Sequence, residues 1–341
     1  MTGIMRGYAL RHGVMDEPNA RSAHRMPTPR GGGISFVMAY LVLLCILYLW
    51  GTGQLRPSVG LLTVLLFGGG SVALIGFIDD HRHVPIRWRF SVHAMAAMLA
   101  VYLLGVPLCK DGALGFWMGM VLAPLAVVAI VWSLNLFNFM DGIDGIASIE
   151  AITVTGGAAL ILYLLGSTGA EIFWLMALAA SVAGFLVWNW PPARIFMGDS
   201  ASGFLGFAIP VLALYSAGEE GISLWSWLIL LGMFLVDATW TLVRRMFSGQ
   251  RWYEAHASHA YQILARRRIH SIIRLGVDPD QARARGHRWV TLRVAAINVF
   301  WLFPLALGAS LYPQWGPLLT SGAILPLVFI EGYSGAGRED R

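Results

Sequence analysis

Charged residues are scarce in this sequence. Asp, Glu, Lys and Arg together make up 13% of its 341 residues, whereas a soluble domain carries roughly 25% to keep its surface hydrated. This scarcity excludes a soluble enzyme and a disordered chain. Cysteine is also scarce: Cys45 and Cys109 both lie among apolar residues, which excludes a disulfide scaffold and a cysteine-based zinc site.

Long apolar runs take the place of the missing charge, since 57% of the residues are hydrophobic. A membrane helix needs about twenty mostly apolar residues, and the runs lack the alternation of a β-barrel. We therefore predict an all-α polytopic integral membrane protein of about ten transmembrane helices, with one domain over residues 1–341. The runs cover residues 34–50, 60–78, 91–108, 113–133, 148–166, 171–189, 203–217, 222–243, 290–311 and 315–331.

The basic residues give the predicted orientation. Of the 24 Lys and Arg residues, only Arg56 and Lys110 fall in the loops of one side. Because Lys and Arg favour cytoplasmic loops, the other side faces the cytoplasm. Residues 1–33 have no apolar core, so we expect no cleavable signal peptide and expect the first span to act as an uncleaved insertion signal. The cytoplasmic segments are then 1–33, 79–90, 134–147, 190–202, 244–289 and 332–341.

Unusual polar clusters all fall on this cytoplasmic side, which indicates one site. They are Pro27–Gly33, Asp79–Asp80, Asn135–Gly145, Arg194–Ser200 and His256–Gln262.

The cluster after the fourth run suggests a magnesium site. Asp141 and Asp144 are three residues apart and would share a helix face, and Asn135 and Asn138 repeat that spacing. Carboxylate and amide oxygens are ligands that Mg²⁺ prefers. The alternative is a turn capped by these side chains.

Two other acidic positions have both a structural and a functional interpretation. Asp79 and Asp80 repel each other at a membrane boundary unless a cation or proton offsets the repulsion, although such a pair is also a common helix cap. Asp199 precedes the seventh run and suits an N-cap. A helix beginning there would also present its N-terminus to phosphate oxygens.

The histidine segment points to phosphate contact. His256 and His259 stand near several arginines, and no third soft ligand accompanies them as a zinc site would require. Asp237 has Thr241 four residues later and Arg244 seven residues later, so we interpret it as structural. We assign the other histidines, His287 among them, to interfaces or loops.

These motifs resemble one family, the polyprenyl-phosphate N-acetylhexosamine-1-phosphate transferases. The resemblance runs from about residue 13 to residue 270 and combines the Asp16–His24 segment and the Pro-Thr-Pro-Arg-Gly-Gly-Gly run with the four other clusters. It implies that sugar-1-phosphate moves from a UDP-N-acetylhexosamine to undecaprenyl phosphate, with release of UMP. It also implies Mg²⁺, which Mn²⁺ could replace, and a place in the bacterial inner membrane with the site facing the cytoplasm. No nucleic acid partner is expected, and a homodimer is compatible with the resemblance.

The resemblance also implies roles for residues. Asn138 and Asp199 match the family's metal ligands, and Asp79 and Asp80 match its pair near the lipid phosphate. The expected substrate-binding residues are Asn135, Asp141, Asp144, Arg89, Arg194, His256 and His259.

Two features distinguish the chain within this resemblance. The segment His-Ala-Ser-His-Ala-Tyr-Gln resembles the branch that starts O-antigen chains with an N-acetylated 6-deoxyhexosamine. Family members also usually carry a further span before the Asp16–His24 segment, which is either absent here or precedes the first residue of this sequence.

A lipid phosphate is largely dianionic at neutral pH and gains little from a general base. We therefore expect direct in-line attack on the donor's β-phosphorus, with a covalent aspartyl-phosphate route as the alternative. Two other classes of protein are weighed against the transferase: an intramembrane aspartyl protease and a secondary transporter. Both require charged groups deep in the membrane, whereas the predicted spans hold almost none.

Overall fold

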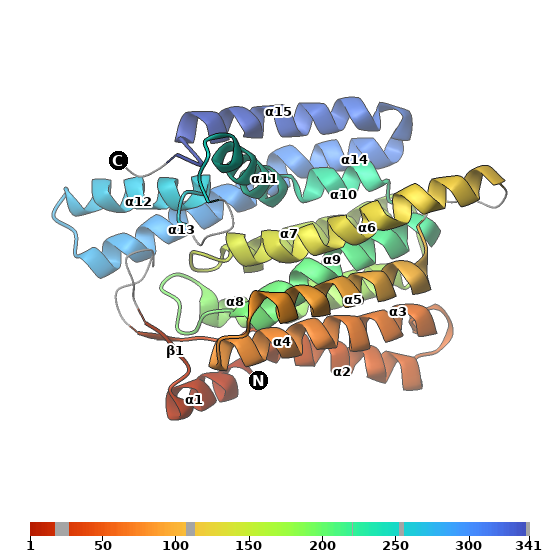
Figure 1. The fold of residues 1–341 in the computed structure, drawn as a ribbon, viewed down its shortest axis with the longest axis horizontal. Helices are drawn as coiled ribbons and strands as arrows, with labels where there is room; N and C mark the ends of the chain where they lie inside the picture. The colour runs from red at the N-terminus through yellow and green to blue at the C-terminus, as the bar shows by residue number, and fades with distance from the viewer. Residues whose placement is uncertain (18–26, 107–112, 220, 252–255, 339–341) are drawn as a thin grey trace.

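A computed structural model describes residues 1–341 except 18–26, 107–112, 220, 252–255 and 339–341 (Figure 1). Cys109, Lys110 and residues 18–24 of the N-terminal segment lie outside the described residues. Nearly all of the described chain is helical, and its two strands, β1 (Met15–Asp16) and β2 (Thr28–Pro29), pair antiparallel with Met15 opposite Pro29.

Fifteen α-helices follow one another along the described chain. They are α1 (Thr2–His12), α2 (Ile34–Trp50), α3 (Val59–Thr63), α4 (Gly70–His81), α5 (Ile86–Leu104), α6 (Ala113–Met140), α7 (Ile146–Leu164), α8 (Glu171–Asn189), α9 (Asp199–Glu219), α10 (Leu224–Leu230), α11 (Gly232–Phe247), α12 (Ala260–Ile273), α13 (Pro279–Ile297), α14 (Phe303–Leu311) and α15 (Gly316–Ser334). Short π-helical segments, η2 (Val64–Gly69) and η3 (Asn298–Leu302), join α3 to α4 and α13 to α14, and two 3₁₀ turns are η1 (Gly53–Leu55) and η4 (Pro313–Trp315).

The protein is an all-α polytopic membrane protein, but its spans are not all alike. Each of the ten apolar runs forms a helix or joined helices. Seven helices in the described residues are long and apolar enough to cross a membrane, and α10 with α11 makes an eighth if this pair, bent by 72°, is one span. The expected number of ten is therefore higher than length and composition support. The helix α2 has only 17 residues, and α5 carries Arg87 and Arg89 in its first turn.

The helices lie roughly alongside one another, and α9 runs through their middle (Figure 1). Its membrane-length part is 78% buried, the highest share among the seven spans in the described chain. It packs against α4 on one side and α6 on another. Residues at the first turn of α9 are therefore surrounded by other helices.

One end of the bundle gathers the predicted polar clusters. The last residues of α4 and α6, the first residues of α5 and α9, and the strand pair lie at the left in Figure 1, where α12 and α13 extend furthest. Two glycines permit close packing here. A Cβ on Gly76 would lie 2.6 Å from the backbone of Asp199, and Gly198 has φ +84° with its Cβ position 2.5 Å from an Asp80 carboxylate oxygen.

Candidate active site

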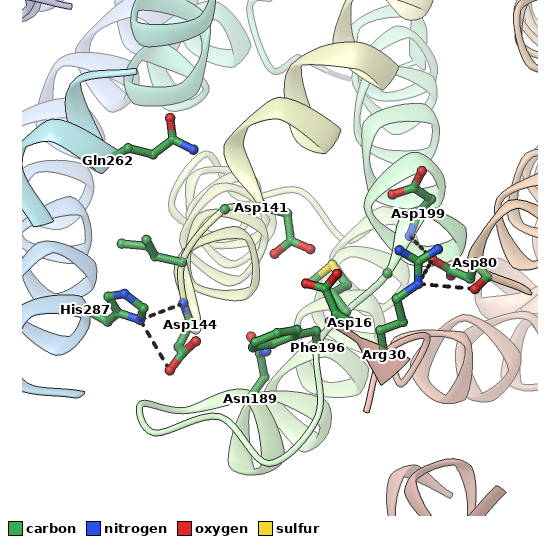
Figure 2. Close-up of a pocket in the computed structure, with 14 residues that line it drawn as sticks. Asp16, Arg30, Asp80, Asp141, Asp144, Asn189, Phe196, Asp199, Gln262 and His287 are labelled. Atoms are coloured by element: carbon green, nitrogen blue, oxygen red, sulfur yellow. Dashed lines mark hydrogen bonds and ion pairs between the residues drawn. The ribbon is translucent and has the colours of Figure 1, made fainter. Parts of the chain in front are cut away.

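A polar cavity opens at this end of the bundle (Figure 2). Its lining combines predicted and unpredicted residues from eight separate stretches of the chain. They are Asp16, Arg30, Asp80, Asp141, Gly142, Ile143, Asp144, Asn189, Phe196, Met197, Gly198, Asp199, Gln262 and His287.

Asp80 caps the first turn of α9. Its carboxylate accepts the backbone N–H groups of Asp199 at 3.1 Å and Ser200 at 3.5 Å. A carboxylate at this position satisfies N–H groups that have no partner within the helix and interacts favourably with the helix dipole. The sequence predicts that the N-terminus of α9 could bind phosphate oxygens. In the structure a side chain from α4 occupies this position.

Arg89 joins the other carboxylates of the centre. Its guanidinium donates to Asp79 Oδ2 and lies 3.1 Å from Asp199 Oδ2. Asp79 Oδ1 also accepts the N–H of Val84 at 2.7 Å, so the side chain is held from two directions. The predicted residues Asp79, Arg89 and Asp199 thus form one ion-pair network between α4, α5 and α9.

Asn138 completes this network from α6. Its Nδ2 donates to Asp199 Oδ1 at 2.9 Å and lies 3.4 Å from Ser202 Oγ. Asn138 and Asp199 are far apart in sequence, so the structure brings together the two predicted metal ligands.

Arg30 closes the network from the glycine-rich run. Its side chain donates to the backbone carbonyls of Asp79 and Asp80, each at 3.2 Å, and its Nε lies 3.4 Å from Asp80 Oδ1. The run itself is fixed by backbone hydrogen bonds from Gly32 to Phe196 O and from Gly33 to Met197 O, each 3.0 Å. The predicted clusters at 27–33, 79–80 and 194–200 therefore meet in one place.

Asp141 and Asp144 stand on one loop but in opposite electrostatic surroundings. Burial raises the pKa of Asp141 well above its usual range, and the charges of Asp199, Asp80 and Asp144 add to this effect. Burial also acts to raise the pKa of Asp144, but the hydrogen bond and charge of His287, the N–H of Ala193 and the charge of Arg283 outweigh it and lower that pKa. The two surroundings therefore act in opposite directions, favouring the protonated form of Asp141 and the carboxylate form of Asp144.

The loop that carries these carboxylates is firmly held. Gly145 has φ +79° and donates its N–H to Asn189 Oδ1 at 3.0 Å. Asn189 in turn donates to Ile195 O, and Thr291 Oγ1 donates to Asp144 O at 3.0 Å. Residues from α8 and α13 thus fix the backbone that follows α6.

The histidine segment is built around Asp237 rather than around the cavity. His259 Nδ1 lies 3.1 Å from Asp237 Oδ1, and both side chains are 3% exposed. The same carboxylate accepts the N–H groups of Ala260 and Tyr261, each at 3.1 Å, at the start of α12. Asp237 therefore has the structural role expected of it, although its main partners come from α12. His259 is turned toward Asp237 and does not line the cavity.

Three other predicted residues lie away from the cavity lining. Asn135 donates to Val131 O of its own helix. Arg194 is exposed, lies 6.0 Å above the Trp188 ring and accepts at its carbonyl from Arg6. His256 lies beside His259, with ring centroids 5.0 Å apart. Their assignment to substrate binding stays a prediction.

Comparison with known proteins identifies the family. The profile of glycosyl transferase family 4 matches residues 62–217. A probable undecaprenyl-phosphate N-acetylglucosaminyl 1-phosphate transferase of Bacillus subtilis (strain 168) is 28% identical, over 77% of this chain and 73% of its own length. An undecaprenyl-phosphate alpha-N-acetylglucosaminyl 1-phosphate transferase of Yersinia pestis is 27% identical, over 92% of this chain and 82% of its own length.

Residues 62–217 of the chain match glycosyl transferase family 4. The resemblance to polyprenyl-phosphate sugar-1-phosphate transferases drawn from the sequence is thereby confirmed, and the chain is a phosphotransferase.

The part that matches glycosyl transferase family 4 contains most of the predicted site but not all of the cavity. Arg30 precedes the matched residues, and Gln262 and His287 follow them. Sequence analysis did not single out Arg30 or Gln262, nor Asn189 and Phe196 within the match. His287, assigned from the sequence to an interface or loop, instead lies buried on α13 and lines the cavity. For Arg30 a signal existed, because it lies in the glycine-rich run; His287 meets Asp144 only through the fold.

A second cavity borders the same centre. It shares Arg30, Asp80 and Asp199 with the first and adds Asp79, as well as residues near the ends of α1 and α4. Its other lining residues are His12, Gly13, Val14, Met15, His81, Arg82 and His83. The ion-pair network therefore has a cavity on either side.

The residues of the centre suit a hard divalent cation. Within the described residues, no group of three or more His, Cys, Asp or Glu side chains could hold a metal by itself. Mg²⁺ commonly binds through one or two carboxylates together with substrate phosphates. Asn138 and Asp199 each carry side-chain oxygens and are joined through Asn138 Nδ2, and a bound cation would offset the electrostatic effect of Asp80 and Asp199 on Asp141.

Proposed function

We propose that this protein transfers an N-acetylhexosamine-1-phosphate from a UDP-sugar to undecaprenyl phosphate and releases UMP. The names of its two relatives support the acceptor and the N-acetylglucosamine class of sugar. The observation that carries the proposal is the network in which Arg89 joins Asp79 and Asp199 beside Asn138. It lies next to a polar cavity at the end of a membrane bundle, where an anionic donor and a lipid acceptor could meet.

The donor fits the first cavity with its diphosphate toward the network. Arg30 and Arg89 supply positive charge at that end and can form paired hydrogen bonds with phosphate oxygens. Phe196 offers an aromatic face in the same cavity, and Asp144 offers a carboxylate at the opposite end. A diphosphate would be repelled by Asp144, so the nucleoside part lies nearer to Asp144.

The acceptor reaches the network from the membrane. The exposed apolar side chains Ile86, Trp88 and Phe90 alternate with Arg87 and Arg89 at the start of α5, and such a mixture of aromatic and basic residues is typical of a membrane interface. A prenyl chain could lie against these apolar groups while its phosphate meets Arg89. This arrangement supports a lipid phosphate as the nucleophile.

The chemical step needs positioning and charge neutralisation more than a strong base. The second pKa of a phosphate monoester is about 6, so the attacking phosphate is already mostly dianionic. Asp79 and Asp80 hold Arg89 and Arg30 in place, and these arginines offset the charge that gathers around the β-phosphorus. We propose direct in-line attack, with UMP as leaving group.

We propose Mg²⁺ as the cofactor, held by Asn138 and Asp199, with Mn²⁺ able to replace it. When bound, the ion would neutralise diphosphate oxygens and stabilise the departing UMP. Arg89 now contacts Asp199 Oδ2 and would share this carboxylate with the ion.

We also propose a setting for the reaction. The one-sided distribution of Lys and Arg favours a site facing the cytoplasm of a bacterial inner membrane. The form of the 256–262 segment favours a 6-deoxy N-acetylhexosamine and a role in initiating O-antigen chains.

A panel of UDP-sugars tests the proposed function. Washed membranes containing the protein are given each UDP-sugar with or without undecaprenyl phosphate, and UMP is measured. We expect UMP release only with the lipid phosphate and only with N-acetylhexosamine donors. Release that ignores the acceptor, or that occurs equally with non-acetylated sugars, would contradict the proposal.

A further inference from the structure

A buried histidine stands at the end of the donor cavity away from the ion-pair network. Figure 2 shows His287 beside Asp144 on one side of the cavity, with Arg30, Asp80 and Asp199 on the opposite side. The histidine comes from α13 and is 1% exposed. It lies outside residues 62–217, the part of the chain that matches the family.

The contacts of His287 are directed at Asp144. Its Nδ1 lies 3.4 Å from Asp144 Oδ2 and 3.5 Å from the backbone N of Asp144. With a proton on Nδ1 the ring donates to the Asp144 carboxylate, whereas an unprotonated Nδ1 accepts the Asp144 N–H; the two are alternatives, and the hydrogen bond to the carboxylate is the stronger. Among the described residues, Nε2 has no hydrogen-bond partner. Among the described residues, the polar contacts of the ring are therefore made through Nδ1.

Close helix packing fixes the position of the imidazole ring. A Cβ on Gly286 would lie 2.5 Å from the side chain of Ile269, so α12 and α13 approach each other closely at this point. Thr291, one turn further along α13, donates to Asp144 O at 3.0 Å. The α13 helix thus holds both the backbone and the carboxylate of Asp144.

The other groups that face Asp144 act mainly on one oxygen of its carboxylate. Ala193 N–H donates to Oδ2 at 3.0 Å from the segment after α8. Arg283 on α13 contributes positive charge, and Asp141 on the same loop has a pKa that burial raises well above its usual range. Ala193 N–H and His287 Nδ1, both among the described residues, meet Oδ2, and Asp144 lines the cavity. The carboxylate can therefore accept an N–H or O–H from a ligand.

We propose that His287 is a positioning residue for the donor: through Nδ1 it holds Asp144 as a hydrogen-bond acceptor for the nucleoside part of the UDP-sugar. The inference rests on the proposed function for the identity of the donor. His287 acts through Asp144, at the end of the cavity opposite the diphosphate. Substitution of His287 should therefore change the affinity for the donor and leave the rate of the transfer step unchanged.

Two substitutions separate positioning from a merely structural role. His287→Asn keeps an N–H near the place of Nδ1, whereas His287→Leu keeps bulk and removes the donor. We expect His287→Leu to raise the KM for the UDP-sugar about tenfold, as for the loss of one hydrogen bond to a charged group. The kcat and the KM for lipid phosphate should stay within about twofold, and His287→Asn should recover most of the donor affinity.

The pH profile gives a readout that a packing defect would not produce. His287 helps to lower the pKa of Asp144, so the wild-type carboxylate persists as pH falls. In His287→Leu the pKa of Asp144 rises, and the acid-side increase in donor KM should begin at a higher pH. His270→Leu, at an exposed position on α12, is the matched control and should leave the profile unchanged.

Equilibrium binding of UDP to the detergent-purified protein separates this inference from the proposed function. His287-dependent UDP binding without transfer would support the role of His287 and contradict the transferase activity. Normal turnover with an unchanged donor KM in His287→Leu would overturn the role of His287 alone. Equal rises in KM for donor and acceptor, or equal impairment in His287→Asn and His287→Leu, would also overturn it.

Discussion

At the scale of single residues, the two carboxyl groups of the 141–144 loop have pKa values that are shifted in opposite directions because their neighbours differ. Asp141 faces other carboxylates, and Asp144 faces a histidine, a backbone N–H and an arginine. Neighbouring acids with separated pKa values can play different roles in one site. The sequence predicts that both line a nucleotide pocket but gives no means to distinguish them.

This difference predicts opposite responses to the same substitution. Asp141→Asn replaces a carboxyl group whose raised pKa favours the uncharged form by a neutral amide, and it should keep more than about a third of the activity at pH 7. Asp144→Asn removes a charge that His287 stabilises and should raise the donor KM about tenfold. Steady-state kinetics of the two variants checks this, and a larger loss in Asp141→Asn than in Asp144→Asn would contradict the assignment.

The pH dependence of stability follows from the same pair. The folded-state pKa of Asp144 is lowered, so its ionisation stabilises the protein above the unfolded pKa, and this contribution is lost as pH falls through the folded pKa. Thermal unfolding between pH 7 and pH 3 should therefore show a smaller acid-induced loss of stability in Asp144→Asn than in the wild type. An identical acid limb in both proteins would show that Asp144 is not preferentially ionised in the folded state.

At the scale of elements, helix starts are secured by carboxylates from other helices. Asp80 of α4 caps α9, and Asp237 of α11 caps α12 while pairing with His259. Such caps join elements far apart in sequence and position the loops between them. From the sequence, such an aspartate can be interpreted either as a helix cap or as a site residue. Caps formed between helices explain why one aspartate can have both roles.

The cap at α12 should be costly to remove. Asp237→Ala leaves the buried N–H groups of Ala260 and Tyr261 without their acceptor, which costs about 1–3 kcal/mol for each group, so the substitution should lower the melting temperature of the purified protein strongly. Asp280 pairs with Arg283 at 3.7 Å and has a 60% exposed side chain. Asp280→Ala should therefore change the melting temperature little. Equal shifts in the two variants would contradict a structural role for Asp237.

Packing at the start of α9 gives a second test at this scale. Gly198→Ala would place a Cβ against Asp80 and Gly31 in a left-handed backbone conformation, which costs about 1–3 kcal/mol from backbone strain alone. Gly70→Ala meets no atom within 4 Å and lies in a helix, so it should be neutral or slightly stabilising. The activity and the melting temperature of both variants are measured. An unchanged activity and melting temperature in Gly198→Ala would contradict the close approach of Gly198 to Asp80.

How far the sequence predicts these elements depends on how local the signal is. The apolar runs located each long helix, because burial in a membrane leaves an unbroken stretch of apolar residues. The 72° bend between α10 and α11 was not predicted, since Leu230, Leu231 and Gly232 continue the apolar run without a polar marker. Arg30 and His287 were missed because their partners are distant in sequence and only packing brings them together.

At the scale of the whole molecule, a sparse set of charges is concentrated at one end of an apolar bundle. The buried helix α9 runs from that end through the middle, and α4, α5 and α6 bring Asp79, Arg89 and Asn138 to its first turn. The arrangement brings a polar donor site and a membrane-facing surface to one network of ion pairs. The proposed function requires this network to lie at the edge of the bilayer, where a lipid phosphate is found.

Isotope exchange tests the central claim, that this network is where the sugar-1-phosphate is transferred. Membranes with the protein are incubated with labelled UMP, a UDP-N-acetylhexosamine, undecaprenyl phosphate and Mg²⁺, and label in the UDP-sugar is measured. The account predicts exchange that requires both the lipid phosphate and Mg²⁺, and at least about a hundredfold loss in Asp199→Asn, the range seen when a charge-stabilising group is removed from an active site. Full exchange in Asp199→Asn would contradict it.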